Sequence, residues 1–143
     1  MRGYVRLQDT PLEDVTHIDG VDYRVIPNTN RRLACSSDGV FIGGFRKILI
    51  PRKQSSGYLW YSYRNADGKY RNMYAHRGVA LVWLDNPGGL HYVNHLDGNK
   101  YHNSAVNLEW CTARHNNAHA RQLGLIWNIP TKGQQGFQRG TNV

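Results

Sequence analysis

The chain has 143 residues, 40% of them hydrophobic, which is enough for one compact domain with a modest core but not for a second full domain. Its 18 Lys and Arg against 10 Asp and Glu leave a formal charge of +8, so the surface is expected to attract polyanions in a salt-dependent way. Excess cations that only keep a small protein soluble would produce the same composition.

Cysteine usage bears on metal sites and on the compartment. Cys35 and Cys111 form no CxxC pair and have no spacing suited to a tetrahedral site, so no structural zinc is expected. Two cysteines are also too few for a disulfide framework, which indicates a reducing compartment. We find no cleavable leader and no segment long enough to cross a bilayer, and therefore expect a soluble, cytoplasmic protein.

The first half of the chain is expected to be rich in short strands. Residues 1–22 show no clear periodicity of hydrophobic residues and are predicted to form an arm or a short strand. Strands are predicted over 23–26, 39–42 and 47–50, each bounded by Gly, Pro, Asn or Asp. The strongest β pattern is the pair 57–64 and 69–74, because the intervening loop ends in Asp-Gly, which supplies the positive φ of a tight hairpin.

Basic residues lie close to this hairpin on both sides. Cations beside aromatic rings are typical of a surface that binds nucleic acid. Tyrosines that fill a core and cations that are simply solvated would explain the same composition. The basic residues are Arg46, Lys47, Arg52, Lys53, Arg64, Lys69 and Arg71.

The second half predicts a helix followed by a strand, loop, strand, helix unit. Residues 75–84 place apolar side chains at helical spacing, although Gly78 costs a helix up to about 1 kcal/mol. Asn86 to Gly89 break the chain. Strands over 92–96 and 108–111 then flank an irregular loop, and a helix over 113–123 begins after Thr112 and ends at Gly124. Residues 126–143 are predicted to form an extended basic tail with Lys132 and Arg139.

One histidine within this unit lies among amides at fixed spacing. The segment VNHLDGN contains Asn94 and His95, and NLEWCTARHNN contains Asn107 and Asn116. A neutral histidine can take a proton from water, and oxygen ligands on a neighbouring backbone can hold a hard divalent cation beside it. Hydrolysis of a phosphodiester requires these two functions.

This pattern resembles the HNH nucleases, and in particular the homing-endonuclease branch carried by phages and mobile introns. The similarity runs from about residue 36 to residue 125. It includes SSDG, LIPRKQSSGYLWYSY, AHRGVALVW, VNHLDGNKYHNSAVNLEW and TARHNNAHA. The earlier part resembles the nuclease-associated modular motif that often precedes this type of domain, and the later part resembles the HNH core.

The resemblance implies an α+β fold in which a small antiparallel β-sheet region precedes a ββα-metal core. It divides the chain into an unassigned arm (1–22), a β-rich DNA-binding region (23–74), a nuclease core with its preceding helix (75–125) and a basic polar tail (126–143). A monomer is the simplest expectation for a chain with one such motif.

The resemblance also implies roles for individual residues. His95 is the general base, Asn94 and Asn116 are the metal ligands, and Asn107 completes the catalytic set by holding His95 in orientation. The alternatives are that His95 has only a structural role and that Asn116 is a capping or surface residue of the helix. Because Asn117 is adjacent, the second metal ligand is either Asn116 or Asn117. Asp97 is expected to form the turn after the first strand, and a role as a metal ligand is the alternative. DNA contacts are expected from His76, Arg77, Arg52, Lys53, Arg71, Arg114 and Arg121. A structural bond is the alternative for His76, and solvation alone would explain Arg114 and Arg121 equally well.

The function implied is a nuclease dependent on Mg²⁺, Mn²⁺ or another divalent cation that nicks or cuts double-stranded DNA, in the host cytoplasm if phage-encoded. Asn94 departs from the Asp or His that many HNH enzymes have before the base. Because a neutral amide is a weak ligand, the scissile phosphate would have to complete the site. The alternative is an inactive nucleic-acid-binding protein that retains the HNH fold. A third possibility is a basic RNA-associated protein unrelated to nucleases. In that case the similarity between the second half of the chain and the HNH nucleases would be a coincidence.

Overall fold

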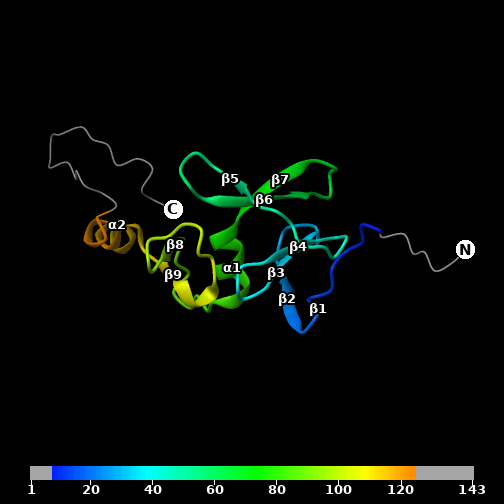
Figure 1. The fold of residues 1–143 in the computed structure, drawn as a ribbon, viewed down its shortest axis with the longest axis horizontal. Coiled ribbons are helices and arrows are strands. Elements are labelled where there is room, and N and C mark those ends of the chain that lie inside the picture. The colour runs from blue at the N-terminus through cyan, green and yellow to red at the C-terminus, as the bar shows by residue number, and fades with distance from the viewer. Residues whose placement is uncertain (1–7, 125–143) are drawn as a thin grey trace, which may run out of the picture.

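The computed structural model describes residues 8–124, so the predicted basic tail (126–143) lies outside the described residues. Three small antiparallel sheets and two α-helices follow one another along the chain (Figure 1), which is the mixed α+β class expected from the sequence. Neither of the helices in this range is long and apolar enough to cross a membrane.

The first sheet has four strands in chain order: β1 (Val15–Ile18), β2 (Val21–Val25), β3 (Leu33–Cys35) and β4 (Phe41–Gly43). The strands predicted near β2 and β4 are present, whereas β3 was not predicted. The segment expected as an arm or short strand contains β1, whose inward-facing residue is Thr16. Its hydroxyl donates to Glu13 at 3.0 Å. A polar residue at the inward position weakens the alternation that predicts a strand.

The strand predicted over 47–50 is wrong. This segment forms a single bridge between Ile42 and Ile48, and the amide of Leu49 donates to the carbonyl of Phe41 at 2.8 Å. Pro51 has no N–H to continue a ladder. The segment instead leads from the first sheet to the second.

The second sheet contains the predicted hairpin. Its strands are β5 (Arg52–Lys53), β6 (Leu59–Arg64) and β7 (Tyr70–Tyr74), and Arg64 pairs with Tyr70 across the turn. Gly68 has φ +82°, and its amide donates to the carbonyl of Asn65 at 3.0 Å. The Asp-Gly prediction is confirmed, because glycine adopts this left-handed conformation without steric cost.

Helix α1 (Ala75–Trp83) lies in the centre of the molecule (Figure 1) and contacts all three sheets. Gly78 faces the ring of Phe41, which stacks on Tyr61 with 4.2 Å between centroids. A Cβ at Gly78 would lie 2.9 Å from Phe41 Cε2 and 2.9 Å from Ile26 Cδ1. The glycine that weakens the helical pattern therefore permits close packing of the helix on the core.

The last unit consists of β8 (Tyr92–His95), β9 (Leu108–Cys111) and α2 (Ala113–Gln122), with the short 3₁₀ turn η1 (Ala105–Asn107) before β9. The strand register pairs Asn94 with Glu109 and His95 with Leu108. Thr112 caps α2 by accepting from the amide of His115 at 3.1 Å, as predicted. Val93 and Leu108 join the central core, which attaches this unit to the rest of the molecule.

Candidate active site

His95 ends β8, and its side chain is buried, with 5% of the residue exposed. Its Nε2 lies 2.8 Å from Oδ1 of Asn103. Nδ2 of Asn103 donates to the carbonyl of Lys100 at 3.3 Å, and a carbonyl can only accept, which assigns the amide orientation. Nε2 of His95 must therefore carry the hydrogen, so Nδ1 has the lone pair and is the basic nitrogen.

The surroundings of His95 favour the neutral ring. Burial lowers its pKa, while the Asn103 hydrogen bond and the charge of Asp97 act in the opposite direction. Since burial has the larger effect, the pKa lies below the ordinary value of a histidine. The ring is consequently available to accept a proton at neutral pH.

His76 lies beneath His95 in the protein interior. The two ring centroids are 5.1 Å apart, and Tyr58 stacks on His76 at 5.0 Å. Only 1% of His76 is exposed, its Nε2 has no hydrogen-bond partner among the described residues, and burial lowers its pKa to about 3. The sequence predicted a DNA contact for this residue, but the structure places its side chain against His95 rather than on the surface.

Asn107 braces the loop that follows β8. Its Nδ2 donates to Asp97 Oδ1 and to the carbonyl of His102, each at 2.9 Å, while its Oδ1 accepts from the Asp97 amide at 3.1 Å. His102 also bonds to Asp97 Oδ2 at 2.8 Å, and this contact is the main reason that the pKa of Asp97 falls to about 2. Asp97 lies in the turn after β8, and its two oxygens take part in this loop network.

A turn from the first sheet supports the same loop. In the SSDG segment, Gly39 has φ +87°, and a Cβ there would lie 2.8 Å from the carbonyl oxygen of Asn103. The carbonyl of Ser37 accepts from the amide of Ala105 at 2.7 Å. The backbone around Asn103 is thus held against residues more than 60 positions earlier, and Asn103 in turn orients His95. Sequence reasoning missed Asn103 because its partner lies across a loop of irregular structure.

Asn94 is buried between β9 and α2. Its Nδ2 donates to Glu109 Oε2 at 2.8 Å, and His119 Nδ1 lies 2.9 Å from the same nitrogen and 3.1 Å from Oδ1. Glu109 also contacts His115 Nε2 at 3.0 Å. Sequence reasoning missed Glu109, His115 and His119. The strand register, which pairs Asn94 with Glu109, would have identified the first of them.

Asn116 is the described residue of α2 that best fits a ligand role. It is 4% exposed, and its Nδ2 has no hydrogen-bond partner among residues 8–124. His119 lies one turn further on the same helix face, and its contact with Asn94 shows that this face is directed at β8. Rotating the Asn116 amide by a half-turn would present its oxygen at the unpartnered position. The buried amides of Asn94 and Asn116 therefore fit the oxygen donors that a hard divalent cation takes.

The acidic and imidazole groups around Asn94 are Glu109, His115 and His119, which are hydrogen-bonded to their neighbours. Within the part of the chain that the structure describes, no group of three or more His, Cys, Asp or Glu side chains is arranged to hold a metal ion.

The predicted DNA-binding cations lie on α1, on α2 and on the second sheet. On α2, Arg114 and Arg121 are exposed. Arg77 donates to the carbonyl of His91 at 2.7 Å and lies over the Trp110 ring. The others, on the second sheet, are also exposed: Arg52, Lys53 and Arg71.

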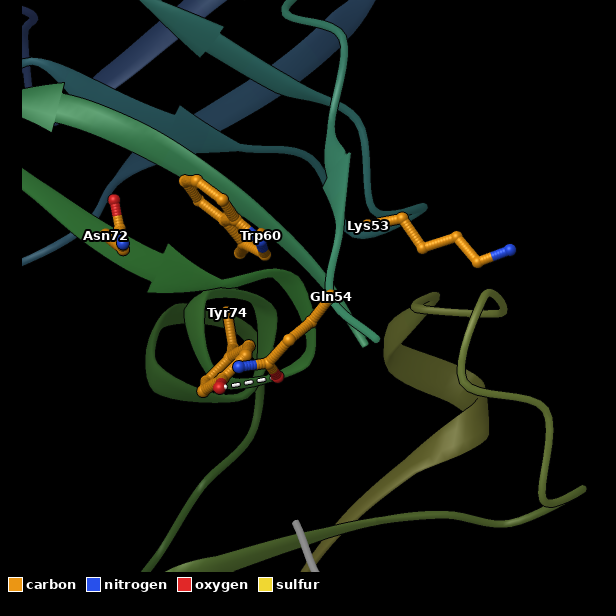
Figure 2. A pocket seen from close by; sticks show the side chains of 5 residues that line it. All are labelled: Lys53, Gln54, Trp60, Asn72 and Tyr74. Carbon is orange, nitrogen blue, oxygen red and sulfur yellow. Dashed lines mark hydrogen bonds between the residues drawn. The ribbon is translucent and has the colours of Figure 1, made fainter. Parts of the chain in front are cut away.

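A pocket of about 350 Å³ opens on the second sheet. Figure 2 shows its lining: Lys53, Gln54, Trp60, Asn72 and Tyr74. The Tyr74 hydroxyl donates to Gln54 Oε1 at 2.8 Å, and the Arg52 guanidinium lies 5.6 Å from the centre of the Trp60 ring. Aromatic faces, amides and cations thus meet on one sheet, which is a combination suited to nucleic acid.

Comparison with known proteins identifies relatives of this chain. L245 of Acanthamoeba polyphaga mimivirus, an uncharacterized HNH endonuclease, is 36% identical over 94 residues, which are 66% of this chain and 28% of the relative. YosQ, derived from the SPbeta prophage of Bacillus subtilis (strain 168) and named as an HNH homing endonuclease, is 38% identical over 96 residues. That alignment includes 64% of this chain and 54% of YosQ. The chain therefore spans about half the length of one relative and less than a third of the other.

A solved structure is also similar. The HNH homing endonuclease I-HmuI, from a study of its DNA binding and cleavage, matches with a TM-score of 0.64 and 27% sequence identity. The match covers 75% of this chain and 61% of that protein. No family model matches the sequence.

Proposed function

Because the chain belongs to the HNH homing-endonuclease family, we propose that it is a divalent-metal-dependent endonuclease that hydrolyses phosphodiester bonds in duplex DNA. The observation that carries this proposal is the state of His95. Its Nε2 is engaged by Asn103 at 2.8 Å and its pKa is lowered by burial, so Nδ1 carries the lone pair of a neutral ring at neutral pH. A buried histidine held in one tautomer by an amide is arranged for proton transfer.

In the proposed reaction, Nδ1 of His95 takes a proton from the attacking water. The water oxygen forms the new bond to phosphorus, the bond to the 3′ oxygen breaks, and the departing 3′ oxygen takes a proton from solvent, so that the products are a 5′-phosphate and a 3′-hydroxyl. Asn103 maintains the tautomer through Nε2. Asn107 acts at a distance by bracing the loop on Asp97 and His102. Both are positioning residues.

The metal site is assigned to Asn94 and Asn116. A divalent cation there would stabilise the negative charge that develops on the phosphate and its leaving oxygen. Both amides are buried, and α2 presents Asn116 on the side that contacts β8. We also propose that the exposed cations and the aromatic pocket of the second sheet contact the DNA. These are the roles predicted for Arg52, Lys53 and Arg71.

The nuclease proposal is tested by incubating supercoiled plasmid with the full chain and Mg²⁺ or Mn²⁺. We expect nicked or linear DNA, and no product in EDTA. His95→Ala should reduce the rate by about 10²- to 10⁴-fold, the usual contribution of a general base. The matched control is His17→Ala, which removes an exposed histidine of β1. If His95→Ala cleaves as fast as the wild type, the assignment of the base is wrong.

A second function, binding of nucleic acid without cleavage, is favoured by one observation. Asn94 is a neutral residue whose amide is hydrogen-bonded to other side chains. Under this alternative the plasmid stays intact with every metal tested, while a gel-shift assay shows that the protein binds it. These two results together would contradict the nuclease proposal and support binding without cleavage.

A further inference from the structure

We propose that Glu109 supplies the negative charge of the metal site through its hydrogen bond to Asn94, an inference that rests on the function proposed above. Both proposed ligands, Asn94 and Asn116, are neutral. Hard divalent cations in proteins are normally held by at least one carboxylate, so two amides alone leave the cation's charge uncompensated. Glu109 is an acidic side chain in direct contact with one of these amides.

The strand pairing places Glu109 at this position. Asn94 of β8 and Glu109 of β9 are directly opposite in the antiparallel register, so their side chains emerge on the same face of the sheet. The resulting contact joins Asn94 Nδ2 to Glu109 Oε2 at 2.8 Å. The same carboxylate oxygen contacts His115 Nε2 at 3.0 Å, so α2 holds Glu109 from the other side.

Glu109 also determines how the Asn94 amide is turned. A carboxylate only accepts hydrogen bonds, so the atom that faces it must be the amide nitrogen. The oxygen of Asn94 is therefore directed away from Glu109. When His119 has its lone pair on Nδ1, it accepts the second hydrogen of the same nitrogen, at 2.9 Å. The oxygen then keeps its lone pairs for a cation.

The contact has an electronic consequence as well. A hydrogen bond from an amide N–H to an anion polarises the amide and makes its oxygen a more basic ligand, as carboxylates do for metal-bound histidines. Asn94 and Glu109 together can therefore replace the single Asp that many HNH enzymes carry at the position of Asn94. In this arrangement Glu109 is a positioning residue: it orients the Asn94 amide and supplies a negative charge beside it.

The test is the affinity of the full chain for Mn²⁺, measured by electron paramagnetic resonance. The titration is done without DNA and with a phosphorothioate duplex that resists hydrolysis. Glu109→Gln keeps the shape and a hydrogen-bond acceptor but removes the charge. We expect its Mn²⁺ affinity to fall by about 10- to 100-fold, the usual effect of losing a partner of a metal ligand. Its melting temperature should stay close to that of the wild type, because Glu109 is partly exposed.

The matched control is Glu13→Gln. It removes the same charge from a different ion pair, with Arg46, ahead of β1. Its Mn²⁺ affinity should equal that of the wild type, which would exclude a general effect of net charge.

A rescue variant separates charge from structure. Adding Asn94→Asp to Glu109→Gln exchanges the two groups, so that the amide introduced on β9 can donate to the carboxylate introduced on β8. The double variant should recover most of the lost Mn²⁺ affinity. Asn94→Asp alone is its control, because a carboxylate ligand raises affinity in either background. If Glu109 supplies the charge, Asn94→Asp should raise Mn²⁺ affinity more in Glu109→Gln than in the wild type, whereas a purely structural role for Glu109 would give equal gains. The double variant also provides the test if Glu109→Gln alone does not fold.

Three results would contradict the inference. They are unchanged Mn²⁺ affinity in a folded Glu109→Gln, equal losses in Glu13→Gln and Glu109→Gln, and, among folded variants, a gain from Asn94→Asp that is no larger in Glu109→Gln than in the wild type. Plasmid cleavage by the wild type distinguishes these results from failure of the proposed function. If the wild type cleaves DNA and Glu109→Gln binds Mn²⁺ normally, only the role of Glu109 is wrong.

Discussion

Two histidines in contact illustrate how burial and hydrogen bonding set the chemistry of single residues. His95 and His76 are both buried, and burial lowers the pKa of each. His95 has Asn103 on one nitrogen, which leaves the other as a base, whereas Nε2 of His76 has no hydrogen-bond partner among the described residues. We therefore expect the first residue to affect the pH dependence of the proposed activity and the second to affect the pH dependence of stability.

The lowered pKa of His95 predicts the pH profile of cleavage. The base must be neutral to accept a proton, and a pKa below the ordinary value of about 6.5 keeps it neutral in mildly acidic solution. The single-turnover nicking rate should rise with pH and reach half its maximum below pH 6.5. Measurement between pH 5 and 8 at saturating metal checks this. A half-maximum above pH 7 would contradict the assigned environment of His95.

His76 should make the protein less stable in acid. Its pKa is about 3 in the folded chain but about 6.5 in the unfolded chain, so below pH 6.5 only the unfolded chain takes up this proton. Stability is lost as pH falls from 6.5 toward 3, and this group should cost roughly 2 kcal/mol by pH 5. Urea unfolding at pH 7.5 and pH 5 measures the loss. His76→Phe should reduce it, whereas His17→Phe, at an exposed position, should not.

At the scale of elements, helix α1 and the turn of the second sheet depend on different properties of glycine. Gly68 is needed for its φ of +82°, and no atom lies within 4 Å of the Cβ it lacks. Gly78 has a helical backbone and is needed for the space occupied by Phe41 and Ile26. Turn chemistry can be predicted from neighbouring residues, but the packing surface of a helix cannot.

Gly78→Ala should destabilise the protein although alanine favours helices. The added methyl would lie 2.9 Å from the ring of Phe41, which stacks on Tyr61 and has little freedom to move. We expect a loss of about 1–3 kcal/mol in the free energy of unfolding, which is typical of an overpacked core. Gly88→Ala is the control, since its Cβ would meet no atom closer than 3.7 Å. Equal stability of the two variants would contradict this packing.

At the scale of the whole molecule, one central core joins the three sheets through α1. It contains Phe41 of β4, Tyr61 of β6 and Leu108 of β9, among others. The turn after β3 extends this connection to the candidate active site, where Gly39 lies against the backbone of Asn103. The N-terminal sheet therefore supports the position of His95 as well as its own strands.

Gly39→Ala should lower the nicking rate through this long-range contact. Its Cβ would lie 2.8 Å from the carbonyl oxygen of Asn103 and would displace the residue that orients His95. Gly20→Ala is the matched control, because Gly20 has a similar φ of +81° but open space around the missing Cβ. Both variants should lose stability from backbone strain, whereas only Gly39→Ala should lose activity in the folded protein. Equal nicking rates for the two would show that the turn does not support the site.

Much of the fold follows from patterns that are local in the chain. The hairpin with its Asp-Gly turn, the Thr112 cap and the strand, loop, strand, helix order were predicted correctly because neighbouring residues determine them. The three-residue β3 was missed and a strand over 47–50 was wrongly expected. Such short segments carry too few residues for a periodic pattern, and their pairing is decided by the strands beside them.

By itself the sequence indicated the resemblance to HNH nucleases, the fold class and the residues proposed for the central chemistry, because His95, Asn107 and Asn116 lie in short motifs of neighbouring residues. Only the tertiary structure decided that His76 is buried beneath His95, that Asn103 selects its tautomer and that Glu109 contacts Asn94. These relations depend on strand register and on side chains from distant segments meeting in space. The physical reason is that hydrogen bonding and burial are set by neighbours in three dimensions, and most of those neighbours are remote in sequence.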